Sequence, residues 1–145
     1  MGLLTDFVAA TREDALQYEA FVRAGNSASP DRFERCEYKN FTPLALELLW
    51  AVLRGDKEAK KLRRLEHIYH TGDGETWLER FPDDFVRLLS ALDENAVTSV
   101  ALVWADGNVE VPGNAAELEP VLRDLRRLAV QGRESGRSLY LWGSL

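Results

Sequence analysis

The spacing of apolar residues changes along this chain, and each spacing predicts a different kind of element. Apolar residues that run together or alternate with polar ones predict three short strands, at residues 3–9, 33–41 and 138–142. Apolar residues that recur at intervals of three and four predict four helices, at residues 11–24, 44–54, 82–92 and 114–133. The helix over 44–54 is apolar on nearly every side, which is typical of a central helix.

Residues that commonly begin or end helices agree with these boundaries. Thr11, Thr42 and Asn114 each stand directly before a helical pattern, where an N-cap side chain is expected. Gly55 and Gly136 stand directly after one, where glycine favours the helix end.

Other stretches have weaker patterns. The small and polar residues 25–30 predict a loop. Asp56 predicts the start of a short charged helix that runs to about residue 66. A turn is then expected over 67–74, and a short helix or irregular segment over 75–81.

Residues 93–111 fit two structures. Val97, Val100, Ala101 and Trp104 form an apolar helix stripe, with Asp93 as its cap, whereas the Asp106–Gly107 dipeptide suits the turn of a β-hairpin. The helix is the favoured prediction. A proline at position 120 is expected to separate the first turn of the last helix from the rest.

This order of elements predicts an α+β fold class. We expect a mostly helical single domain over residues 1–145, in which the N- and C-terminal strands meet in a small antiparallel sheet. Strands and helices do not alternate regularly, which argues against a doubly wound parallel sheet.

Composition narrows the class of protein and its location. The 145 residues carry a net charge of −6, which argues against a general nucleic-acid binder. No stretch approaches the roughly 18 apolar residues that a membrane helix needs, and the start of the chain carries no targeting signal. Cys36 is the single cysteine, which fits a reducing compartment. We therefore expect a bacterial-type cytoplasmic protein that binds neither nucleic acid nor membrane.

The net charge is unevenly distributed. Residues 54–64 hold six basic and two acidic residues, and residues 120–145 hold five basic and two acidic residues. Residues 73–119, by contrast, hold two basic and eleven acidic residues. If the last helix lies against the acidic span, part of this charge is neutralised within the molecule. An uncovered acidic face would attract a basic partner.

The chain offers one group of residue types that could bind a metal ion. If the charged helix continued past residue 66, His67 and His70 would share one of its faces, and Asp73 or Glu75 could add an oxygen ligand. The alternative is that both imidazoles bind free carbonyls at a helix end. Outside this group the sequence predicts no cofactor.

Catalytic signatures are otherwise absent. Cys36 lies in no nucleophile motif, and core packing explains it best. Asp83 and Asp84 are adjacent and would diverge on a helix, so a helix N-terminus explains both carboxylates. Phosphate-loop, nucleophile-elbow and dinucleotide motifs are missing. The sequence therefore leans against an enzyme.

Four tryptophans are many for a chain of this length. The apolar stripes that contain Trp50 and Trp104 predict core positions. Trp77 and Trp142 could be exposed and serve in an interface, although packing in a small core is the favoured interpretation.

Four segments together resemble a group of small uncharacterised bacterial proteins. They are Gly2 to Phe7, Pro43 to Leu53, Arg80 to Asp84, and Gly136 to the final Ser-Leu. The resemblance implies a helix around residues 93–105 and implies no activity, so no functional residue follows from it.

Small size, missing catalytic motifs and a strongly acidic stretch favour a protein-interaction module, such as an adaptor, a regulator or a toxin-neutralising immunity-type protein. The first alternative is a small-ligand or metal-binding domain that uses His67 and His70. The second is an enzyme of unrecognised type, which would need a deep pocket with converging polar groups.

Overall fold

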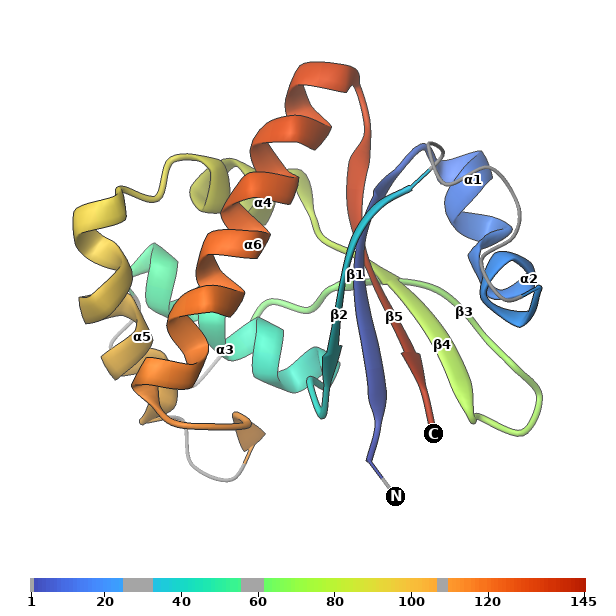
Figure 1. The fold of residues 1–145 in the computed structure, drawn as a ribbon, viewed down its shortest axis with the longest axis horizontal. Coiled ribbons are helices and arrows are strands. Elements are labelled where there is room, and N and C mark those ends of the chain that lie inside the picture. The colour runs from blue at the N-terminus through green and yellow to red at the C-terminus, as the bar shows by residue number, and fades with distance from the viewer. Residues whose placement is uncertain (1, 25–32, 56–61, 107–109) are drawn as a thin grey trace.

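The computed structural model describes residues 2–24, 33–55, 62–106 and 110–145. Within them a single sheet has the strand order β2-β1-β5-β4-β3, with every neighbouring pair antiparallel (Figure 1). The strands are β1 (Leu4–Ala10), β2 (Glu34–Lys39), β3 (Glu66–His70), β4 (Thr76–Arg80) and β5 (Ser138–Ser144). In the central pair, Leu4 of β1 lies opposite Ser144 of β5. The predicted meeting of the terminal strands is therefore confirmed.

Helices cover both faces of the sheet. They are α1 (Arg12–Leu16), α2 (Tyr18–Arg23), α3 (Pro43–Arg54), α4 (Asp83–Ser90), α5 (Val97–Ala105) and α6 (Ala115–Ser135), with a 3₁₀ turn at Glu94–Ala96. In Figure 1, α3 to α6 lie on one side of the sheet, and α1 and α2 lie on the other. The predicted α+β fold class is confirmed.

The two central strands are buried on both faces. Phe7 and Leu141 pack into the large core beneath α3 to α6. Val8, Tyr140 and Trp142 pack into the smaller core beneath α1 and α2. Side chains alternate between the faces of a strand, so segments covered on both sides should be apolar at consecutive positions, as residues 7–10 of β1 and 139–142 of β5 are.

The predicted helix caps are present. Thr42 accepts a hydrogen bond from the Ala45 amide at 3.2 Å, and α3 ends at Gly55 with a φ of 77°. A capping box joins Asn114 and Glu117 at the start of α6, and Gly136 closes that helix with a φ of 70°. These local side-chain contacts explain why the helix boundaries could be predicted closely.

The ambiguous stretch after residue 92 is helical. Asp93 caps the 3₁₀ turn, and α5 buries Val97, Ala101 and Trp104, which share one helix face. The hairpin alternative is wrong for these residues, and 107–109 lie outside the described residues. The expected break at Pro120 is also wrong, because α6 passes through this exposed proline without interruption.

Two elements were predicted wrongly. Residues 62–65 are not helical, and residues 66–70 form β3 where the end of a charged helix and a turn were expected. Residues 76–80 form β4 where a helix or irregular segment was expected. β4 is held between β3, which directly precedes it, and β5, which is distant in the chain, so part of its pairing is not visible in the local sequence. The expected loop at 25–30 and the expected helix start at 56–61 lie outside the described residues.

Candidate functional site

The two histidines share one face of β3. His67 lies opposite Glu79 of β4, and His70 lies opposite Trp77. Residues three apart on a regular strand point to opposite faces, but the register shifts between His67 and Tyr69. This bulge brings both imidazoles to the same side of the sheet. The sequence allowed a shared face only on a continued helix, whereas here a bulged strand provides it.

Glu79 completes a short chain of polar contacts with the histidines. Nδ1 of His67 lies 3.0 Å from Oε1 of Glu79, and Nε2 of His67 lies 3.1 Å from Nδ1 of His70. The His67 side chain is 50% exposed, whereas that of Glu79 is 13% exposed. The carboxylate is therefore a fixed partner, and the imidazoles are open to solvent.

The acidic residues predicted to join the histidines lie elsewhere. Asp73 and Glu75 are exposed in the turn between β3 and β4, where Asp73 accepts hydrogen bonds from the Thr71 hydroxyl and the Glu75 amide. The bond from Thr71 is the main cause that lowers the pKa of Asp73. Its carboxylate therefore stabilises the turn. The described residues hold no cluster of three or more histidine, cysteine or acidic side chains suited to a metal ion.

Cys36 has the environment of an unreactive thiol. It lies on β2, at the opposite edge of the sheet from β3 and its histidines. Burial, followed by the negative charge of nearby Asp124, raises the pKa of the thiol to about 11. One terminal nitrogen of Arg127 lies 2.9 Å from Sγ, and the same guanidinium also pairs with Glu34 and Asp124. A thiol that stays protonated at neutral pH is a poor nucleophile.

Asp83 and Asp84 open α4 and point to different partners. Asp83 pairs with Arg80 at 2.7 Å, and Asp84 pairs with Arg87 at 2.6 Å. The bond from Arg87 is the main cause that lowers the pKa of Asp84. Two carboxylates engaged with separate arginines do not form an acid–base pair.

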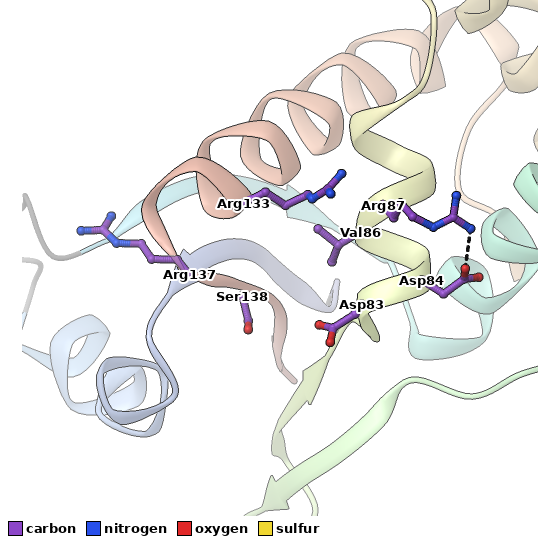
Figure 2. A pocket seen from close by; sticks show the side chains of 7 residues that line it. All are labelled: Asp83, Asp84, Val86, Arg87, Arg133, Arg137 and Ser138. Atoms are coloured by element: carbon purple, nitrogen blue, oxygen red, sulfur yellow. Dashed lines mark hydrogen bonds and ion pairs between the residues drawn. The ribbon is translucent and has the colours of Figure 1, made fainter.

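A hollow of about 400 Å³ lies beside these residues, and Figure 2 shows its lining side chains. Val86 supplies apolar surface, and the Arg133 guanidinium donates to the Ser90 hydroxyl at 2.8 Å. In Figure 2 the Arg137 guanidinium points away from the other labelled side chains. The polar groups of this hollow therefore do not converge on a common point.

The tryptophans mainly serve packing. Trp104 and Trp50 are buried as predicted, and Trp50 stacks on Phe85 with ring centroids 5.4 Å apart. Trp142 is also buried, so the interface role considered for it is wrong. Half-buried Trp77 lies over Gly143, where a Cβ atom would come within 2.5 Å of the indole.

A buried polar network that the sequence did not reveal joins β1, β2 and α2. The Tyr18 hydroxyl donates to Asp6 at 2.5 Å, and Arg35 donates to Tyr18 at 3.1 Å. Arg35 also lies 2.8 Å from the exposed carboxylate of Glu37. Burial is the main cause that raises the pKa of Asp6. These contacts fix α2 to the sheet, and the only sequence signal was an aspartate within an apolar strand.

One side of α5 is uncovered. Leu102 is 60% exposed and Val103 is 57% exposed, and Ser99 and Asp106 flank them on the same side of the helix. We call these four residues the α5 face. In Figure 1, α5 lies at the end of the molecule opposite α1 and α2.

The sequence that contains α5 is acidic. Residues 88–122 contain six acidic residues and no lysine, arginine or histidine. Arg123 and Arg126 of α6 pair with Glu94 at 2.8 and 3.3 Å, so the last helix neutralises part of the acidic span, as considered from the sequence. Asp106, Glu110 and Glu117 stay exposed.

Comparison with known proteins assigns no family to this chain. No protein-family model and no curated protein matches this chain. A solved structure of YfbM from Escherichia coli, a protein of unknown function, is 14% identical, with 98% of this chain and 99% of that chain covered and a TM-score of 0.41. Among the described residues, no helix is both long and apolar enough to cross a membrane.

Proposed function

We propose that this chain is a single-domain cytoplasmic protein that works by binding a basic protein partner through the α5 face. The observation that carries the proposal is the exposure of Leu102 and Val103, side by side, on a helix within a sequence stretch, residues 88–122, that contains no positively charged residue. An adaptor, a regulator and an immunity-type protein would all use such a surface.

Apolar contact would supply affinity at this surface. Fully burying one leucine or valine side chain contributes about 1.5–3 kcal/mol. Leu102 and Val103 are each a little over half exposed, so a partner that covers both would gain about 2 kcal/mol from them. That energy corresponds to more than a tenfold change in the dissociation constant.

Charge would guide the approach of the partner and select a basic one. Asp106 lies within the α5 face, and Glu110 and Glu117 lie beyond the end of α5. Exposed negative charge speeds the approach of a basic partner and repels an acidic one. Because exposed charges are screened by salt, the association rate should fall as ionic strength rises.

The proposal predicts that a double variant, Leu102→Lys with Val103→Lys, loses partner binding. The two substitutions remove the apolar contact and place positive charge opposite a basic surface. We expect affinity for the partner to fall at least tenfold, while the unfolding midpoint stays nearly unchanged because both positions are exposed. Purified wild-type protein and variant would serve as baits in extracts of the source cell, followed by affinity measurement with each captured protein.

Leu16→Lys is the matched control. Leu16 is 49% exposed, but it lies on α1, on the other side of the sheet. This variant should bind the partner as the wild-type protein does. Equal capture by the double variant, or no partner at either low or moderate salt, would overturn the proposal.

A further inference from the structure

The distance between the two imidazoles suits two ligands of one metal ion. In a tetrahedral site with metal–nitrogen bonds of about 2.0–2.1 Å, two ligand nitrogens lie about 3.3 Å apart. Nε2 of His67 and Nδ1 of His70 are 3.1 Å apart. A shift of a few tenths of an ångström would therefore let both nitrogens bind the same ion.

Glu79 stands where a metal-binding histidine commonly has a carboxylate partner. It accepts a hydrogen bond from Nδ1–H of His67, which leaves the lone pair of Nε2 directed toward His70. The same hydrogen bond holds the ring orientation. Glu79 is thus a positioning residue and need not touch the ion.

The backbone holds this arrangement in place before any ion arrives. The bulge in β3 places both histidines on one face, and pairing with β4 fixes Glu79 opposite His67. β3 is an edge strand of the sheet, and both imidazoles are exposed, so an ion can reach them from solvent. Two ligands on one strand that is already paired in a sheet lose little backbone entropy on binding.

We propose that His67 and His70 bind one divalent transition-metal ion of the zinc, nickel or copper type, with His67 positioned by Glu79. Imidazole ligands favour these ions, whereas calcium and magnesium require mainly oxygen ligands. Two histidines leave coordination positions for water or for a donor from another molecule. The site lies on β3 and uses none of the α5 face, so metal binding and the proposed protein interaction can be tested independently.

The test is titration of the full chain, purified without a histidine tag, with Ni²⁺, Zn²⁺ and Mg²⁺ separately. We expect one equivalent of Ni²⁺ or Zn²⁺ to bind and Mg²⁺ to show no saturable binding. At a free ion concentration a hundredfold above the dissociation constant, the melting temperature should rise by roughly 5–10 °C. With Cu²⁺, electron paramagnetic resonance should show coordination by two imidazole nitrogens.

Variants separate the proposed ligands from the neighbouring acids. His70→Gln should weaken binding at least tenfold, and Glu79→Gln should weaken it about 10–100-fold. Asp73→Asn and Glu75→Gln change acids in the adjacent turn and should bind as the wild-type protein does. Melting without metal shows whether each variant is folded. Absence of saturable Ni²⁺ and Zn²⁺ binding, or binding that His70→Gln leaves intact, would overturn the proposal.

Discussion

Trp104→Ala should lower the free energy of unfolding by about 3–5 kcal/mol. The Trp104 side chain is fully buried, and its Nε1–H donates to the carbonyl of Ala45 in α3 at 2.9 Å. The substitution leaves a large cavity between α5 and α3 and removes that hydrogen bond. Because a domain has only about 5–15 kcal/mol of stability, a large part would be lost. Urea unfolding followed by circular dichroism measures the change.

Trp104→Phe separates the two contributions. Phenylalanine keeps much of the aromatic contact with Phe41, whose ring centroid lies 5.8 Å from that of Trp104, but it has no donor for Ala45. We expect this variant to lose less stability than Trp104→Ala. A loss below about 1 kcal/mol in Trp104→Ala would contradict the assignment of this side chain to the core.

Asp6→Ala should lower the free energy of unfolding by about 1–3 kcal/mol. It removes the acceptor of the buried Tyr18 hydroxyl and the carboxylate that lies 3.7 Å from Arg35. Since these groups join α2 to β1 and β2, the loss should appear first as loosening of α1 and α2. Hydrogen exchange of the helix amides measures this local effect.

Asp6→Asn tests the electrostatic part of the same contact. Burial raises the pKa of Asp6 above its usual 3.8, so the folded protein holds that proton more tightly than the unfolded chain. The resulting stabilisation is complete below pH 3.8 and is lost as pH rises through the raised pKa. The free energy of unfolding of Asp6→Asn minus that of wild type should therefore be larger at neutral pH than at pH 4.

Unfolding of both proteins in urea at several pH values gives this difference directly. Asp106→Asn removes one negative charge at an exposed position and controls for the change in net charge. A difference between wild type and Asp6→Asn that does not vary with pH would show that the Asp6 carboxylate is not desolvated in the folded protein.

The parts of the fold that could be predicted depend on neighbours in the sequence. The N-caps Thr42 and Asn114 bind amides three residues further on, so their helices carry their own signals. The terminal strands are apolar at consecutive positions because both faces are covered. The helix over 97–105 was favoured for the spacing of the residues that it buries.

The wrong predictions concern β3 and β4, the two strands at one side of the sheet. β3 lies at the sheet edge and carries charged and polar residues, so it has little apolar signal of its own. β4 buries Thr76 and Leu78 against neighbours that include β5, which is far along the chain. Glu79 could not be linked to His67, because that pairing depends on strand register and on the bulge in β3.

The position of β5 determines the order in which the sheet can assemble. In the strand order, β5 is the link between the β2–β1 pair and the β4–β3 pair. Before the segment Ser138–Ser144 takes its place, these are two separate hairpin-like pieces, and isolated two-stranded pieces are marginally stable in water. During synthesis the five strands therefore cannot join into one sheet until β5 has left the ribosome. Contacts between such distant segments also favour slow folding.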